Sequence, residues 1–333
     1  MKKIVDIDAH STLPKYRQIV LSVEIAIAEN RLRRNDRLPS VNKISLGFSI
    51  SRDTVLLAYD ELKKRGIIYA VPGKGYYVKS VEFSFEQRIF LLFDELNAFK
   101  EEIYNAFLQT MDNKAQVDIF FHHFNLDMFR KLINESNGNY SKYIIMPTNL
   151  VGAAAVIKTL PPQDVFILDQ TNSELANYPS VHQNFVKDMY AALFKSKPLL
   201  LKYRQLVLIF PGEKEPVGMV EGFNQFCSDF NFPSEIINGF EDAMIDAGSV
   251  FIIPSDKHLV DVIEQARRQQ LVIGKDFGII SYNDIPLKKV VENGITTIST
   301  DFKRMGKTLA EMVLGNSKMQ IENASDLIVR SSL

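Results

Sequence analysis

Early in the chain, a serine, an arginine and a threonine stand at the front of an amphipathic segment. The run Ser51-Arg52-Asp53-Thr54-Val55 opens this segment, in which apolar residues recur at 55, 58, 59 and 62. This three- and four-residue spacing predicts a helix with Ser51 as its N-cap. The exposed first turn would present Arg52 and Thr54. Arginine pairs with guanine, and threonine contacts thymine methyl groups or phosphates, so the helix is suited to reading duplex DNA.

A basic, glycine-rich turn follows this helix. After Gly66, which suits a left-handed helix C-cap, apolar runs at 67–71 and 76–78 flank Pro72-Gly73-Lys74-Gly75. The pattern predicts a β-hairpin. Such a tip could lie against a phosphate backbone or enter a minor groove, because glycine permits close approach and lysine supplies charge. By itself the tip favours a plain turn, but its place after a recognition-type helix favours a DNA-binding wing.

Two further helices are predicted ahead of the Ser51 helix. Residues 14–30 carry an apolar face at three- and four-residue spacing, and residues 31–36 form a polar connection. Ser40 then suits the N-cap of a short helix with apolar positions at 41, 44, 46 and 48. The elements together predict a small winged helix-turn-helix domain.

The charge of the chain is unevenly distributed. Its 333 residues are 46% hydrophobic and 24% charged, which excludes wholesale disorder and suits two or three lobes. Residues 1–80 hold 15 Lys+Arg and 8 Asp+Glu, a balance of +7, which leaves 24 against 32, or −8, for residues 81–333. A basic head on an acidic body is typical of a phosphate-binding head and a body that stays off the duplex.

The other bulk features narrow the class of protein. Cys227 is the only cysteine, so neither an intramolecular disulfide nor a cysteine-based zinc site is expected. The sequence shows neither an apolar run of membrane-spanning length nor a signal peptide, which predicts a cytoplasmic protein. His122 and His123 would point to opposite faces of a strand, so we expect no metal. The sequence also lacks a glycine-rich nucleotide fingerprint, and we expect no cofactor.

From about residue 86, short apolar runs alternate with amphipathic segments. This alternation predicts an α/β body of doubly wound parallel sheets, and about 245 residues suit two similar lobes with a cleft between them. The predicted strands are 88–93, 117–121, 143–146, 165–168, 206–210, 249–253 and 278–281. The predicted helices are 98–111, 126–134, 151–160, 185–194, 219–230 and 259–269.

Polar residues follow several of these strands, where open parallel sheets bind ligands. Each residue alone favours a helix cap or loop role, but the set favours a site for a polyhydroxylated ligand, with Phe99 or Phe240 stacking on a sugar face. The loops are Asp94-Glu95-Leu96-Asn97, His122-His123, Thr148-Asn149, Asp169-Gln170, Ser255-Asp256 and Asn283-Asp284.

Residues 12–79 resemble the winged-helix domain of GntR-family regulators. The resemblance is carried by Pro14-Lys15-Tyr16-Arg17-Gln18-Ile19, Leu38-Pro39-Ser40, Ser51-Arg52-Asp53-Thr54-Val55, residues 62–66 and Gly73-Lys74-Gly75. Where the family often has arginine or Glu-Arg after Leu-Pro-Ser, this chain has Val41-Asn42, and Asn42 or Lys43 could substitute. The expected DNA-binding residues are Ser40, Asn42, Lys43, Ser51, Arg52, Thr54, Gly73, Lys74 and Gly75.

The C-terminal part resembles the effector domain of LacI/GalR regulators, which are related to periplasmic sugar-binding proteins. Residues 220–223, 253–256, 278–284, 295–302 and 305–306 carry this resemblance. Together with the loop residues above, it implies effector contacts at Asp94, Asn97, Phe99, His123, Thr148, Asp169, Phe240, Ser255, Asp256, Asn283, Thr300 and Phe302. Asn283 replaces the family's usual aspartate, and Met219 stands where many members have a sugar-binding arginine.

A GntR-type head on a LacI-type body resembles the arabinose-repressor architecture. It implies a homodimeric repressor of carbohydrate use that binds operator DNA and responds to a monosaccharide or sugar phosphate, such as a pentose or deoxyhexose. The alternative is a cytoplasmic sugar sensor or an enzyme with a vestigial head. An aminotransferase-like body would need a longer chain and a Schiff-base lysine context, and we expect no enzyme.

We expect a head at 1–79, a linker at 80–87 through which the effector shifts head spacing or mobility, and a body at 88–333. Within the body, the N-lobe would be 88–180 and 300–318, and the C-lobe 181–299 and 319–333.

Overall fold

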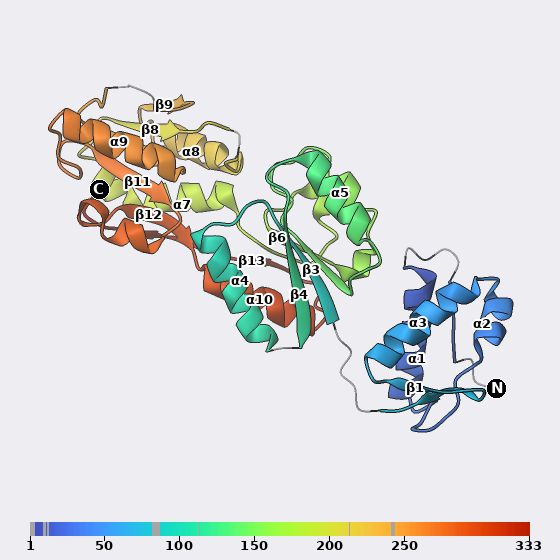
Figure 1. The fold of residues 1–333 in the computed structure, drawn as a ribbon. Helices are drawn as coiled ribbons and strands as arrows, with labels where there is room; N and C mark the ends of the chain where they lie inside the picture. Colours follow the sequence, from blue (N-terminus) through green and yellow to red (C-terminus); the bar gives the residue numbers. More distant parts are fainter. Residues whose placement is uncertain are drawn as a thin grey trace.

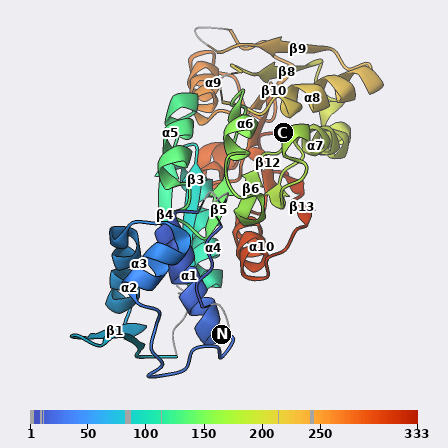
Figure 2. The same cartoon turned by 90° about the vertical axis from the view of Figure 1, so that its right-hand side faces the viewer.

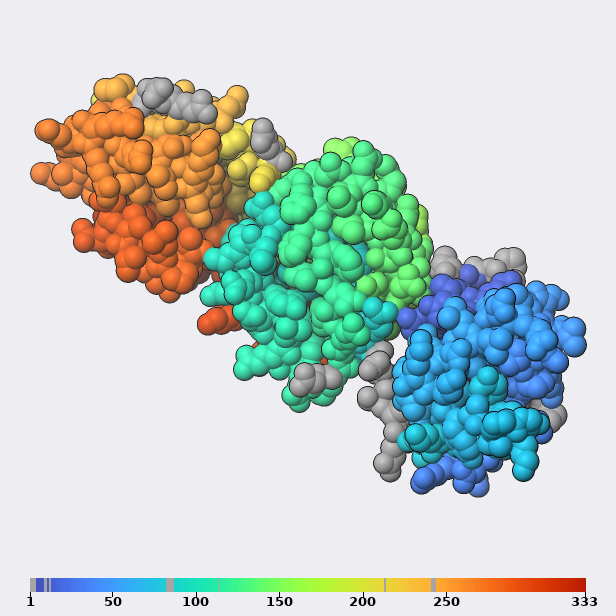
Figure 3. Space-filling view, viewed as in Figure 1, coloured from blue at the N-terminus to red at the C-terminus, as the bar shows by residue number. Residues whose placement is uncertain are grey.

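The computed structural model of the chain describes residues 4–8, 11, 13–81, 87–112, 114–212, 214–240 and 244–333. Three bodies lie in a row: a head, an N-lobe and a C-lobe (Figures 1 and 3). Most of the expected linker, residues 82–86, lies outside the described residues. None of the helices in the described part of the chain is long and apolar enough to cross a membrane.

The head has the expected winged-helix architecture. Its elements are α1 (Lys15–Ala28), α2 (Val41–Phe48), α3 (Arg52–Lys64), β1 (Ile68–Val71) and β2 (Gly75–Val78). The apolar faces of the three helices form one core, and the Tyr59 hydroxyl donates a hydrogen bond of 2.6 Å to Pro39 O. The strands pair antiparallel, and Arg37 forms a bridge to Tyr77.

The N-lobe is a six-stranded sheet in the order β13-β7-β6-β5-β3-β4. Its strands are β3 (Gln87–Phe93), β4 (Ala115–Phe121), β5 (Lys142–Ile145), β6 (Val165–Asp169), β7 (Ser180–His182) and β13 (Gln320–Glu322). Its helices are α4 (Ala98–Met111), α5 (Leu126–Ser136), α6 (Ala153–Ile157) and α10 (Phe302–Leu314). All strand pairs in this sheet are parallel, as the continuous apolar strand patterns predict.

The C-lobe repeats this plan with the strand order β14-β12-β11-β10-β8-β9. Its strands are β8 (Gln205–Ile209), β9 (Ser234–Ile237), β10 (Ser249–Ile253), β11 (Gly278–Tyr282), β12 (Thr296–Thr300) and β14 (Ser325–Ile328). Its helices are α7 (Phe185–Leu200), α8 (Gly218–Asp229) and α9 (Asp256–Arg268). Only β14 runs antiparallel to its neighbour among these described strands.

The lobe boundaries differ from the expected ones near the end of the chain. Residues 319–333 were expected in the C-lobe, but β13 pairs with β7 in the N-lobe sheet, and only β14 joins the C-lobe. β7 itself also belongs to the N-lobe, although residues from 181 onward were expected in the C-lobe. These strands are three residues long, and such short strands carry no detectable hydrophobic period.

After the C-lobe strand β12, the chain returns to the N-lobe as α10, which packs closely against α4. α10 lies beside α4 (Figures 1 and 2). At Gly306 of α10, a Cβ atom would come within 2.2 Å of Ile103 O of α4. Glycine therefore lets the two backbones touch. This contact fixes α4, whose N-terminus lies at the boundary with the C-lobe.

Candidate functional site

The first candidate site is the exposed front of α3. Ser51 has extended backbone, and its Oγ accepts a hydrogen bond of 3.1 Å from Thr54 N, as a helix N-cap does. The Ser51 and Thr54 hydroxyls are also 2.7 Å apart. Arg52 is exposed, and its side chain makes no hydrogen bond or ion pair with the described residues. Its guanidinium is therefore free to meet an anion or a base edge.

The wing lies next to this region in the chain and has the expected conformation. Gly73 and Gly75 adopt positive φ angles of 72° and 112°, which side chains with a Cβ rarely adopt. Lys74, at the tip, is exposed. The Arg37 guanidinium would lie 3.4 Å from a Cβ placed at Gly75, so a second cation flanks the wing. The sequence analysis did not select Arg37, because it lies in a loop distant from the hairpin in sequence.

The remaining expected DNA-binding residues surround α2. Ser40 caps this helix by accepting a hydrogen bond of 3.2 Å from Lys43 N. Ser40, Asn42 and Lys43 are exposed. α2 precedes α3 in the order of a helix-turn-helix, whose first helix crosses the DNA backbone. The nine expected residues therefore stay predictions of contact, on elements that the fold places as required.

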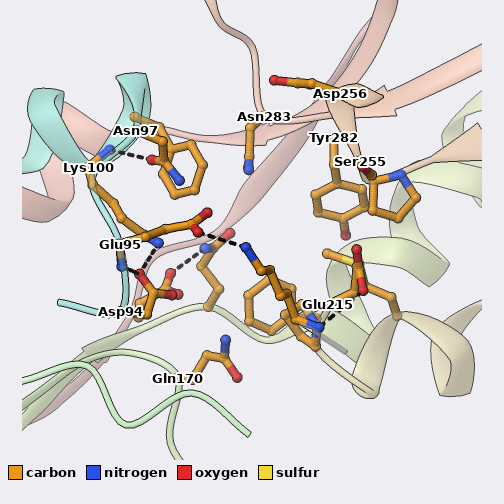
Figure 4. A pocket seen from close by; sticks show the side chains of 18 of the residues that line it. Asp94, Glu95, Asn97, Lys100, Gln170, Glu215, Ser255, Asp256, Tyr282 and Asn283 are labelled. Carbon is orange, nitrogen blue, oxygen red and sulfur yellow. Dashed lines mark hydrogen bonds and ion pairs between the residues drawn. The ribbon is translucent and has the colours of Figure 1, made fainter. Parts of the chain in front are cut away.

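The second candidate site is a cavity of about 380 Å³ between the N-lobe and the C-lobe. Loops after β3, β6, β8, β10 and β11 contribute to its lining, so the carboxyl ends of both sheets face it. Aromatic side chains, including Phe99, Phe124 and Tyr282, add apolar surface. Figure 4 shows the polar side chains converging from both lobes.

The N-lobe wall of this cleft holds a buried charged cluster. Lys100 of α4 pairs with Asp94, and both side chains are almost fully buried. Asp169 accepts a hydrogen bond of 2.6 Å from Gln183 Nε2. Burial raises the pKa of the Asp169 carboxyl to about 6, although the Gln183 hydrogen bond and the Lys100 charge oppose this shift. The cluster therefore combines fixed hydrogen-bond partners with a carboxyl that titrates near neutral pH.

The C-lobe wall is built around a buried lysine. Lys288 is 3% exposed, and its Nζ lies 2.7 Å from Asp256 Oδ1. The same ammonium donates hydrogen bonds to Tyr282 O and Asn283 O, at 2.5 and 3.2 Å. Burial lowers the pKa of Lys288, and the Asp256 charge opposes that shift. Lys288 thus holds together the two loops that carry Asp256 and Asn283.

The two walls are joined across the cleft. Lys214, after β8 of the C-lobe, pairs with Glu95, after β3 of the N-lobe, at 2.8 Å. Its ammonium also lies 4.8 Å from the centre of the Phe124 ring. Beside this pair, Asn149 Nδ2 donates a hydrogen bond of 2.8 Å to Glu215 O.

Seven of the twelve expected effector residues line this cavity, although none is thereby shown to bind an effector. They are Asp94, Asn97, Phe99, Asp169, Ser255, Asp256 and Asn283. The Asn97 Oδ1 atom accepts a hydrogen bond of 3.2 Å from Lys100 N and so caps α4. This oxygen is therefore already used in a structural contact. Asp284, the neighbour of Asn283, is held by Arg330 at 2.6 Å instead.

Five expected residues lie outside the lining. Phe240 is buried against Phe251, with ring centres 5.6 Å apart, so it is a core residue and cannot stack on a ligand as expected. Phe302 stacks on Phe99, and the Thr300 hydroxyl donates to Asn323 O. The Thr148 hydroxyl donates to Pro147 O, and His123 is exposed away from the cavity lining.

Several other residues of the cleft have no local sequence signal that marks them as site residues. Lys100, Phe124, Gln183, Lys214 and Tyr282 line the cavity. Lys100 and Tyr282 lie inside a helix and a strand, where periodicity marks them as ordinary element residues. Lys214 lies in a loop with other charges, and no local pattern says that it reaches the opposite lobe. In the described part of the chain, no group of three or more His, Cys, Asp and Glu residues could hold a metal ion.

Comparison with known families agrees with this two-part construction. Residues 15–78 match the model of bacterial regulatory proteins of the gntR family, and residues 201–333 match a periplasmic binding protein-like domain. The uncharacterized HTH-type regulator YcxD of Bacillus subtilis is 36% identical over 66 residues, which are 20% of this chain. The match spans only 15% of that relative, and a match to YydK of the same species spans 28%.

A relative similar over its whole length is the arabinose metabolism transcriptional repressor of Geobacillus stearothermophilus. It is 21% identical, over 97% of this chain and 96% of its own. A Lac repressor dimer bound to operator has a TM-score of 0.60 and 15% identity, over 74% of this chain and 94% of its own. A LacI family regulator from Enterococcus faecium with bound ribose has a TM-score of 0.59 and 16% identity, with coverages of 74% and 98%.

The fold and the two candidate sites define a class of architecture: a winged-helix head that matches a family of bacterial regulatory proteins, and a two-lobed, periplasmic-binding-protein-like body. More particularly, residues 15–78 match the model of the gntR family, and the arabinose metabolism repressor is a relative similar over nearly the full length of this chain. The named relatives are transcriptional regulators rather than enzymes.

Proposed function

We propose that this protein is a cytoplasmic transcriptional repressor of carbohydrate use, controlled by a small sugar-like effector such as a pentose or deoxyhexose. The observation that carries the proposal is the presence, in one chain, of an exposed Arg52 at the front of α3 and a polar cleft of about 380 Å³ between two lobes. The volume suits a monosaccharide. Residues 94, 97, 169, 256 and 283 offer the carboxylate and amide groups that sugar hydroxyls bind.

The proposed mechanism couples the cleft to the head. Two chains pair through their bodies, so that two heads meet a near-palindromic operator. The similar structure of a Lac repressor dimer bound to operator supports this arrangement by analogy. An effector that binds one lobe arrangement more tightly shifts the population toward it, and the segment near 79–86 transmits the shift to head spacing or mobility.

The test separates the two sites. Duplex fragments from the protein's own regulatory region are titrated at low salt by fluorescence anisotropy, with and without arabinose, fucose, ribose and their phosphates. We expect tight binding that one of these compounds changes. Arg52→Ala should weaken operator binding but keep the thermal shift caused by that compound, whereas Asp256→Ala should keep operator binding and reduce that thermal shift. Failure of every fragment to bind, with and without the compounds, would contradict the proposal.

A further inference from the structure

The cleft contains more acidic than basic side chains, and its buried and cross-cleft lysines are already neutralised. Its lining includes five acidic residues and three lysines. Lys100 pairs with Asp94, and Lys214 pairs with Glu95. Lys257 is exposed and follows Asp256 at the start of α9. Lys288, behind the lining, pairs with Asp256. Asp169 and Glu215 are the lining carboxylates that form no ion pair with a described lysine, so an anionic ligand would meet their negative charge.

Two helix N-termini in the lining, those of α4 and α9, do not make up for this excess. A helix N-terminus attracts anions through its free N–H groups and its dipole. Asn97 already accepts a hydrogen bond at the start of α4, and Asp256 places a carboxylate in the first turn of α9. These two helix ends are thus already supplied with acceptor oxygens.

Lys214 is the lining lysine that reaches from the C-lobe to the N-lobe, and a carboxylate of the N-lobe holds it. Its ammonium lies 2.8 Å from Glu95 Oε2 and over the face of Phe124. Burial alone would raise the pKa of the Glu95 carboxyl, but the Lys214 hydrogen bond and charge, with Lys100, lower it overall. Glu95 is therefore ionised at neutral pH. A phosphate that recruited Lys214 would have to displace this carboxylate and break a contact that joins the lobes.

We propose that the Glu95–Lys214 pair makes the cleft selective for an uncharged polyhydroxylated effector and excludes phosphorylated ones. The inference rests on the proposed function for the identity of the site. Sugar hydroxyls both donate and accept hydrogen bonds, so they can bind paired lysines and carboxylates without separating them. The phosphoryl group of a sugar phosphate dianion accepts only, so it would compete with Asp94 and Glu95 for their lysines and would meet the charge of Asp169 in the same lining.

The test uses inorganic phosphate as a probe that does not depend on the identity of the sugar. Wild type and Glu95→Gln are titrated with phosphate at constant ionic strength, and binding is followed by calorimetry and thermal shift. The amide keeps the shape of Glu95 but removes its charge, which leaves Lys214 unpaired. We expect no saturable binding to wild type and an affinity at least about tenfold higher in Glu95→Gln. Adding Lys214→Met to Glu95→Gln should abolish the gain.

A matched control uses an ion pair outside the cleft. Asp127 and Arg130 of α5 pair at 2.9 Å, and the Asp127 side chain is 90% exposed. Asp127→Asn should release an arginine without creating a phosphate site. Equal gains in Glu95→Gln and Asp127→Asn would overturn the proposal, because they would show only a general effect of net charge. Absence of a gain in a folded Glu95→Gln variant would also overturn it.

Matched pairs of sugars then extend the test to effectors. Arabinose and ribose are compared with arabinose 5-phosphate and ribose 5-phosphate on wild type. Tighter binding of a phosphate than of its parent sugar would overturn the selectivity while leaving the proposed regulator intact. If no sugar of either kind binds but the phosphate results are as expected, the charge inference stands and the sugar-responsive function fails.

Discussion

The head and the cleft use charged side chains in opposite ways. In the head, Arg52 and Lys74 are exposed, and neither forms an ion pair with a described residue. In the cleft, Lys100 and Lys214 are each held by a carboxylate, and Lys100 is 3% exposed. Exposed, unpaired cations attract a polyanion at long range, and on binding they take the place of the counterions around that polyanion. Paired, partly buried charges instead offer fixed hydrogen-bond geometry to a small molecule.

The difference shows that charge count alone does not identify a binding partner. The head has a balance of +7 over residues 1–80, and two of its expected DNA-binding cations, Arg52 and Lys74, form no ion pair with a described residue. The lining of the cleft contains three lysines, yet the charge of the buried one, Lys100, is neutralised by Asp94. Variants that break pairs in the cleft should therefore affect stability, and variants in the head should affect binding.

The largest effect is expected from Lys100→Met. It leaves Asp94 buried without its cation, and breaking a buried pair by removing one partner costs about 3–5 kcal/mol. Urea unfolding measures the loss. Lys257→Met, which changes an exposed lysine of the same cleft, should stay within about 0.5 kcal/mol of wild type. Adding Asp94→Leu to Lys100→Met should restore much of the stability, and a loss below about 1 kcal/mol in the single variant would contradict the buried pairing.

Asp169→Asn should change the pH dependence of stability. Burial raises the pKa of Asp169 from 3.8 to about 6, so the folded protein retains a proton that the unfolded chain releases. The stability that this group contributes is complete below about pH 4 and is lost as pH rises through about 6, a change on the order of 3 kcal/mol. The variant should therefore gain stability relative to wild type over that window in urea titrations.

A second variant sharpens this prediction. The Gln183 hydrogen bond lowers the pKa of Asp169, so Gln183→Leu should move the same window to higher pH. Parallel stability profiles for wild type and Asp169→Asn between about pH 4 and 6 would show that this carboxyl does not titrate there.

Arg52→Ala should weaken operator binding by about 1–3 kcal/mol, the usual contribution of a bidentate contact to a base. Fluorescence anisotropy at fixed salt gives the change. Arg52→Lys keeps the charge but not the planar donor fork, so it should lose most of the same affinity if Arg52 reads a base. Full affinity in Arg52→Lys would indicate a phosphate contact instead.

Lys74→Ala should have the smallest effect. An exposed lysine at the wing tip that contacts one phosphate should reduce the slope of log affinity against log salt by about one. The measurement is a salt series of operator titrations. Effector affinity should not change in the same series, and an unchanged DNA slope would place the wing away from the phosphates.

Local sequence patterns were sufficient to predict the secondary structure of the head. The Ser51 cap, the left-handed Gly66 at φ 71° and the hairpin at 68–78 depend on residues within a few positions of one another. The alternating body pattern likewise gave most of the central strands and helices, because their apolar periods are long enough to detect. The short strands β7 and β13 were not predicted. Because both belong to the N-lobe sheet, the predicted division of the lobes was also wrong there.

The residues that line the cleft could be identified only from the tertiary structure. Phe240 and Phe99 looked equivalent as stacking residues, yet Phe240 is in the C-lobe core and Phe99 of the N-lobe lines the cavity. Only the packing of each lobe decides which of its side chains face the cleft. Lys214 and Glu95 are 119 residues apart in the chain and belong to different lobes. Their pairing depends on how two separately folded sheets meet. The sequence by itself determined the helices and hairpin of the head, most central elements of the body and where cations concentrate, because those depend on local period and composition. Only the assembled fold decided which of those charges remain available, because partners distant in sequence neutralise them.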